Sequence, residues 1–332
     1  MDRIRDDASS HARRGARRLS LLLGLSLLLL GGCRDGGSST TPTTPPLPTP
    51  AEPRDLAAVP LETGERPPLR DRIDWSDDDF WILYAAGPAS SIWRIAADGA
   101  SRPLPVSVQD TGGWLDADYA PCALAGGRVA FFHGWYGGDR RLHLLATPLA
   151  ADPGESVTVL HRFPATAVGL APEQASSPQS LTLAADGCVA AGQWQDAYLL
   201  SWPAATADAP LTVHLLEGTA TPAALALSRD GSLLAYRNAE GQVAWGPVTA
   251  PESAVAIGAG DLPAWDGGGR RLAWLSPAAE IMVWDREGDT LVPYRTRLPG
   301  PVVALALAWG GDRVALLVRG APDLVLYVAP LQ

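Results

Sequence analysis

Aromatic and charged side chains gather in two glycine-rich stretches of the chain, TGGWLDADYAP (residues 111–121) and HGWYGGDRR (residues 133–141). Trp194 and Asp196 form a similar, shorter group. Flat rings beside carboxylates, an imidazole and a guanidinium suit a sugar, a peptide or a loop of a partner protein. The alternative for each tryptophan is packing in the interior. We take as candidate ligand or partner residues Trp114, Asp116, Asp118, Tyr119, His133, Trp135, Tyr136, Asp139, Arg140, Trp194 and Asp196.

The remaining reactive residue types do not have the spacing of an enzyme site. The sequence has no Gly-x-Ser-x-Gly elbow, no phosphate-binding loop and no Cys/His pattern of a zinc site. The acidic run Asp74, Asp77, Asp78 and Asp79 offers the oxygen ligands that Ca²⁺ prefers, but such a run is more often a solvated turn. We therefore predict no catalytic residue, no metal and no cofactor.

Three cysteines are present, and Cys33 differs in context from Cys122 and Cys188. Six arginines precede an apolar run, Leu19 to Leu30, and the run leads to Leu30-Gly31-Gly32-Cys33. Twelve residues are too few to span a bilayer, which takes about 20. A basic region, a short apolar region and small residues are the parts of a secretory signal. The run therefore predicts export.

The segment Leu30–Cys33 resembles the lipobox of bacterial lipoproteins. The resemblance implies that residues 1–32 are a signal peptide, and that the Cys33 thiol takes a diacylglyceryl group and acyl chains such as palmitate. Several acyl chains on one cysteine anchor a protein stably in a membrane. In Gram-negative lipoproteins an Asp after the cysteine favours the inner membrane; Arg34 stands here, which implies the outer membrane, facing the periplasm. The alternative is an ordinary signal peptide with an incidental cysteine.

Residues 33–53 are rich in Thr, Pro, Ser and Gly, and we interpret them as a disordered tether. Without residues 1–32 the chain keeps 20 basic and 33 acidic residues, a net charge of −13. This charge argues against a nucleic-acid partner and against binding to bare anionic lipid. An oxidising compartment would allow Cys122 and Cys188 to form a disulfide.

Short apolar strands flanking a Gly or Asp-Gly turn recur along residues 54–332, as in LTLAADGCVA (181–190) and ALALSRDGSLLA (from Ala224). The turn glycines Gly187, Gly231, Gly268 and Gly311 are 44, 37 and 43 residues apart. A period near 40 with about four strands per unit is typical of a β-propeller. We predict an all-β propeller of six four-stranded blades, with seven as the alternative.

The Ser228-Arg229-Asp230-Gly231 and Ala185-Asp186-Gly187 turns resemble those of TolB-like and WD-repeat propellers. The last unit ends at Gln332 after three strands. Because an open ring would expose strand edges, we expect part of residues 54–66 to supply the fourth strand.

In such a blade, alternate connections fall on the same face, so the candidate residues above would form one rim. The leading hypothesis is an envelope-anchored scaffold that binds a protein or a ligand, with an envelope protein or a glycan as partner. The alternative is a carbohydrate-active enzyme, a lyase or a glycoside hydrolase, that uses the aromatic rim. A third hypothesis is a sensor of a small ligand.

Overall fold

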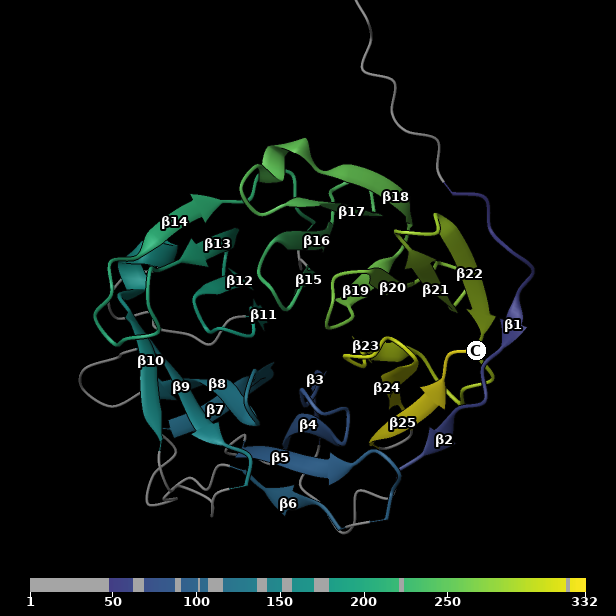
Figure 1. Ribbon diagram of the computed structural model, residues 1–332, viewed down its shortest axis with the longest axis horizontal. Coiled ribbons are helices and arrows are strands. Elements are labelled where there is room, and N and C mark those ends of the chain that lie inside the picture. Colours follow the sequence, from purple (N-terminus) through teal and green to yellow (C-terminus); the bar gives the residue numbers. More distant parts are fainter. Residues whose placement is uncertain are drawn as a thin grey trace, which may run out of the picture. The chain divides into compact units, whose positions relative to one another are not determined.

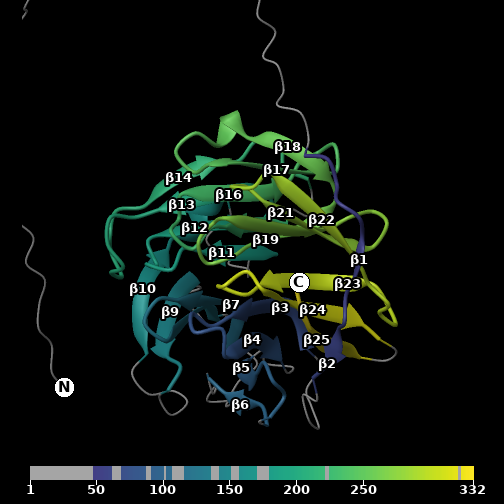
Figure 2. The same ribbon diagram turned by 45° about the vertical axis from the view of Figure 1, so that its right-hand side comes forward.

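The computed structural model describes residues 48–61, 69–86, 91–100, 102–106, 116–135, 142–150, 157–169, 179–220, 224–320 and 323–332. Their strands form six sheets that surround a common axis (Figures 1 and 2). This confirms the prediction of a six-bladed, all-β propeller. Among these residues no helix is long and apolar enough to cross a membrane.

Each sheet is numbered here by its order along the chain, and its first strand lies nearest the axis (Figure 1). The first sheet holds β3 (Leu69–Trp75), β4 (Trp81–Ala86), β5 (Ser91–Ala96) and β6 (Leu104–Pro105). The second holds β7 (Asp116–Leu124), β8 (Arg128–Trp135), β9 (Leu142–Pro148) and β10 (Thr158–Phe163), and the third β11 (Ser180–Leu183), β12 (Val189–Gln193), β13 (Ala197–Ser201) and β14 (Thr212–Leu215).

The fourth sheet holds β15 (Leu225–Leu227), β16 (Leu233–Arg237), β17 (Gln242–Pro247) and β18 (Val255–Ala259). The fifth holds β19 (Asp261–Trp265), β20 (Arg271–Leu275), β21 (Glu280–Asp285) and β22 (Thr290–Arg295), and the sixth β23 (Val302–Leu307), β24 (Arg313–Arg319) and β25 (Leu324–Pro330). Two short 3-10 helices, η1 (Ala165–Val168) and η3 (Pro251–Ser253), lie in connections.

The apolar core is divided among the seams between neighbouring sheets. In the first seam Leu83 of β4 packs with Val129 and Phe131 of β8, and all three are almost fully buried. Strands such as WILYAA are apolar at every position because both faces of a strand within a blade contact a neighbouring sheet. Six such seams make each sheet depend on its two neighbours.

The N-terminal segment closes the ring. Strand β2 (Val59–Pro60) pairs antiparallel with β25 and supplies the fourth strand of the sixth sheet. Strand β1 (Arg54–Asp55) pairs parallel with β22 as a fifth strand of the fifth sheet, which the sequence did not predict. Leu56 is buried between the fifth and sixth sheets, and Leu61 between the sixth and first. This segment, residues 50–61, is called the strap below.

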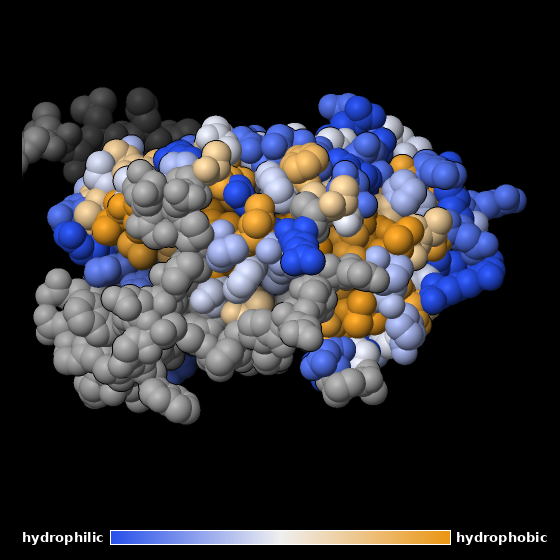
Figure 3. Space-filling model, turned by 90° about the horizontal axis from the view of Figure 1, so that it is seen from below, coloured by the Kyte–Doolittle hydropathy of each residue, from blue (hydrophilic) through white to orange (hydrophobic). Residues whose placement is uncertain are grey.

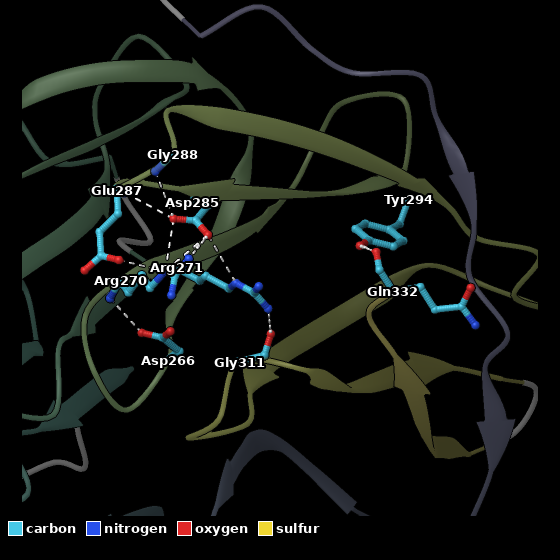
Figure 4. A network of polar contacts seen from close by, with 9 residues as sticks. All are labelled: Asp266, Arg270, Arg271, Asp285, Glu287, Gly288, Tyr294, Gly311 and Gln332. Carbon is cyan, nitrogen blue, oxygen red and sulfur yellow. Dashed lines mark hydrogen bonds and ion pairs between the residues drawn. The ribbon is translucent and has the colours of Figure 1, made fainter.

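A polar network fastens the fifth sheet to the sixth (Figure 4). The Asp285 carboxylate accepts hydrogen bonds from the Arg270 guanidinium, with 2.9 Å to Nη2, and this lowers the pKa of Asp285. Arg271 Nη1 donates to the Gly311 carbonyl of the sixth sheet at 2.7 Å. Tyr294 on β22 donates its hydroxyl to the carbonyl of the last residue, Gln332, at 2.7 Å. The two ends of the described chain are therefore both held at the outer part of these sheets.

Candidate functional site: the central cavity and its two ends

The inner strands of all six sheets surround a cavity of about 100 Å³ on the ring axis. Most of the lining residues have apolar side chains, such as Leu181, Leu227 and Leu305, but polar atoms make up the larger part of the cavity surface. Arg72, Asp74, Cys122, Thr182 and Arg229 are the polar side chains of the lining. An inner strand has no neighbour on its axial edge, so its backbone groups need other partners. Thr182 serves this need by accepting a hydrogen bond from the Leu227 amide at 3.2 Å.

Asp74 and Arg229 form an ion pair across the axis. Asp74 lies in β3 of the first sheet, one residue before the strand ends, and Arg229 lies in the hairpin turn of the fourth sheet, on the other side of the ring. Arg229 Nη1 donates to Asp74 Oδ2 at 2.8 Å, and Nη2 donates to Oδ1. The Asp74 carboxylate also accepts from the amides of Trp75 at 2.9 Å and Ala123 at 2.8 Å. Both charged groups are therefore paired and hydrogen-bonded, as buried charges must be.

The ring leaves room for Arg229 because three of the equivalent turn residues are small. Turn amides at this end bond from sheet to sheet: Ala125 to the Ala185 carbonyl at 3.0 Å, Ala185 to the Arg229 carbonyl at 2.7 Å, and Gly267 to the Trp309 carbonyl at 2.9 Å. The second turn position is thus Ala or Gly in three sheets. Arg229 extends over this space and lies against the Trp309 ring, 5.1 Å from its centroid.

The electrostatics of this end follow from burial and pairing. Burial lowers the pKa of Arg229, but the charge and hydrogen bonds of Asp74 outweigh it, and the pKa lies above its ordinary value. For the nearby Cys122 thiol, burial and the charge of Asp74 raise the pKa to about 12. The thiol is therefore protonated at neutral pH and is a poor nucleophile. The arrangement locks the ring and has no group poised for acid–base or covalent chemistry.

The hairpin-turn face is the end of the ring at which the first two strands of each sheet are joined, and Arg229 closes the cavity there. The mouth face is the opposite end, where the inner strands begin and the second and third strands of each sheet are joined. Arg72 and Leu262 line the cavity on its mouth-face side. On this face Asp261 at the start of β19 meets Arg237 at the end of β16, with 3.4 Å between Oδ2 and Nη1.

The structure places some of the candidate rim residues at the mouth face and does not describe others. The backbones of Asp116, Asp118 and Tyr119 lie in β7 and those of His133 and Trp135 in β8, where Asp116 pairs with Trp135 and Asp118 with His133. This register places the start of β7 and the end of β8 together at the mouth face. His133 is half-buried, and Asp196 is exposed in the turn between β12 and β13. Trp114, Tyr136, Asp139 and Arg140 lie outside the described residues.

The prediction that Trp194 belongs to an exposed rim is wrong. Its side chain is 3% exposed and packs in the core between the second and third sheets, where its ring centroid is 6.2 Å from that of Phe132. Gly192 makes this possible, because a Cβ there would lie only 2.8 Å from the Trp194 ring. A glycine two positions before a turn tryptophan is the signal that could have indicated this inward packing.

The possible Cys122–Cys188 disulfide is not formed, and both thiols are free. Cys122 lies on an inner strand with its Sγ 3.4 Å from the Ala120 carbonyl. Cys188 lies in a hairpin turn, where its backbone carbonyl accepts from the Trp202 amide at 3.0 Å and its Sγ lies 3.8 Å from the Asp186 carbonyl. The two side chains therefore lie in different parts of the ring, one on an inner strand and the other in a hairpin turn.

The acidic run after β3 holds sheets together. Asp77 accepts from the amides of Gly126 at 2.7 Å and Gly127 at 3.0 Å in the second sheet. Asp79 accepts from the amides of Trp309 and Gly310 in the sixth sheet, the latter at 2.7 Å. These carboxylates point to different neighbours, and the described residues contain no cluster of acidic, His or Cys side chains that could hold a metal.

Sequence reasoning missed the Asp74–Arg229 pair. The available signal was a long cation, Arg229, at a turn position where other units have Ala125, Ala185 and Gly267. A second signal was Asp74, a carboxylate inside a strand otherwise expected to be buried.

Comparisons with known proteins agree with the fold. No model of a protein family matches the chain, and no curated protein is similar to it in sequence. Among solved structures, TolB from Acinetobacter baumannii is similar over 77% of this chain and 65% of its own, with 12% identity and a TM-score of 0.50. A chain of the mitotic checkpoint complex matches 92% of this chain and 99% of its own (12% identity, TM-score 0.49). A chain of a nidogen/laminin complex matches 67% and 83% (10% identity, TM-score 0.44).

Proposed function

We propose that this protein is an envelope lipoprotein whose β-propeller is a rigid scaffold for a protein partner, with the mouth face as the binding surface. The observation that carries the scaffold proposal is the narrow axis of the ring. A cavity of about 100 Å³ is small beside the roughly 300–1,000 Å³ of pockets that enclose drug-sized ligands. The Asp74–Arg229 pair also occupies one end of it. Recognition on the outer surface therefore fits this ring better than chemistry in its centre.

The position of the strap supports an anchored display. Pro50 forms a bridge with Leu291, and the Ala51 amide donates to the Leu291 carbonyl at 2.7 Å, so the strap begins at the outer edge of β22. A tether that joins the ring at its outer edge leaves both faces open to partners. Residues 34–49 as an extended, Pro-rich spacer would reach roughly 50 Å at about 3.1 Å per residue.

Lipid attachment is tested by metabolic labelling with a palmitate analogue in the native bacterium. The full chain should carry the label and sediment with membranes, whereas Cys33→Ser should lose both properties because only the Cys33 thiol takes the lipid. Cys188→Ser is the matched control and should remain labelled. Retention of label and membrane association by Cys33→Ser would refute the anchor.

The scaffold is tested by crosslinking intact envelopes and recovering the full chain. We expect one protein partner in near-stoichiometric amount, and we expect Asp196→Arg on the mouth face to reduce its recovery. Asp208→Arg, at an exposed position between β13 and β14, is the matched control. Turnover of an envelope glycan by the purified chain would contradict the scaffold and favour the carbohydrate-active enzyme.

A further inference from the structure

Arg94 on β5 lies at the outer end of the seam between the first and second sheets. It pairs in register with Leu83 of β4 on one side and Leu104 of β6 on the other. Leu83 belongs to the core of this seam, so Arg94 marks the point where the core reaches the surface. Its guanidinium lies over the Trp81 ring, with its Cζ 4.7 Å from the centroid. This cation–π contact fixes the direction of the side chain.

No carboxylate neutralises this guanidinium within the described part of the chain. Its Nε is buried and has no hydrogen-bond acceptor there, and the only contact of the side chain with a charged, polar or aromatic group is with Trp81. Burial lowers the pKa of Arg94, and no acidic group acts to raise it. This is unusual in a chain with a net charge of −10, where acids outnumber bases.

Apolar side chains are exposed beside Arg94. Phe80 is 47% exposed and meets Trp81 edge-on, with ring centroids 4.8 Å apart, and Leu104 is 40% exposed. Figure 3 views the side of the ring that carries β5 and β6, and it shows apolar residues gathered between hydrophilic margins. Tryptophan, arginine and flanking apolar groups are the combination that most often dominates the energy of protein interfaces.

We propose that Phe80, Trp81, Arg94 and Leu104, here called the Arg94 surface, bind a protein segment that carries an Asp or Glu next to an apolar side chain. The carboxylate would pair with the guanidinium, which has no acidic partner among the described residues, and the apolar side chain would cover Leu104 and Phe80. Charge complementarity identifies the occupant, because only an acidic group satisfies both the charge and the donors of Arg94.

The Arg94 surface is separate from the mouth face. Phe80 and Trp81 directly follow the turn that joins β3 to β4, so the surface lies toward the hairpin-turn face. The ring would therefore hold a second partner independently of the first. The proposal does not depend on lipidation or on the mouth-face partner.

The test selects a displayed library of random dodecapeptides on the full chain and, in parallel, on Arg94→Met. Methionine retains much of the apolar stem and removes the charge. We expect the peptides recovered on the native chain to share an acidic residue beside an apolar one, and to be lost on Arg94→Met. Arg102→Met, an exposed arginine close by in sequence, is the matched control and should keep them. Melting of each variant verifies that it is folded.

A recovered peptide is then measured against its Asn or Gln counterpart by fluorescence anisotropy. Affinity should fall roughly tenfold or more for the amide peptide and for Arg94→Met, and the two losses should not add, because both remove the same pair. Leu104→Ser, at an exposed position, should weaken binding without altering melting. The proposal would be overturned if no acidic motif is recovered or if Arg94→Met binds the peptides equally well. It would also be overturned if the chain binds phosphatidylglycerol vesicles, in an Arg94-dependent way, in place of peptides.

Discussion

At the scale of single residues, one ion pair decides what the centre of the ring can do. Arg229 and Asp74 are both buried. The Asp74 carboxylate accepts hydrogen bonds from the Arg229 guanidinium and the Ala123 amide, which would otherwise need water. A buried pair adds little net stability over an apolar pair of the same shape, but removing one partner leaves the other charged and unpaired. The pair therefore acts as a lock between the first and fourth sheets.

Arg229→Met is expected to lower the free energy of unfolding by about 3–5 kcal/mol, because it leaves the Asp74 carboxylate without its cation. The double variant Arg229→Met/Asp74→Asn should recover part of this loss. Arg162→Met, which breaks the exposed pair with Asp208, is the control and should cost less than about 1 kcal/mol. Urea denaturation measures all three, and equal losses for Arg229→Met and Arg162→Met would contradict the lock.

At the scale of elements, the strap links three sheets. Leu56 is buried against the fifth and sixth sheets and Leu61 against the sixth and first, while β1 and β2 cover the outer edges of β22 and β25. A sheet with an uncovered edge exposes unpaired backbone groups. The strap is therefore the element on which ring closure depends.

Deleting residues 50–61 should lower the melting temperature and broaden the transition, because it removes both buried leucines and the fourth strand of the sixth sheet. Deleting residues 34–47, which precede the described part of the chain, is the control of similar length and should leave melting unchanged. Calorimetry compares the two deletions. Identical melting curves for the strap deletion and the intact chain would show that the strap does not stabilise the ring.

The sequence predicted those parts of the fold that depend on local signals. Turn glycines such as Gly187 and Gly231, which adopt positive φ, marked the hairpins, and the period between them indicated six sheets. The missing fourth strand after Gln332 pointed to the strap. The parallel strand β1 could not be predicted, since Arg54 and Asp55 are two exposed polar residues with no strand pattern. The inward packing of Trp194 and the reach of Arg229 depend on space left by residues in other strands or sheets, which no local pattern reveals.

At the scale of the whole molecule, the ring has a narrow axis with only a small cavity and an outer edge that joins the proposed tether. At its mouth face, the candidate rim residues lie at the start of β7 and the end of β8. Its likeness to TolB establishes the fold alone, at 12% identity. The scaffold proposal consequently depends on what contacts the mouth face in the cell.

Photo-crosslinking in living cells tests that claim most directly. A photoreactive amino acid at Asp196, exposed on the mouth face, is compared with one at Asp208, exposed elsewhere on the same sheet of the full chain. The scaffold predicts one discrete protein adduct from position 196 and none from position 208. The scaffold proposal would be contradicted if both positions give the same adducts. It would also be contradicted if position 196 gives none while the chain degrades an envelope glycan.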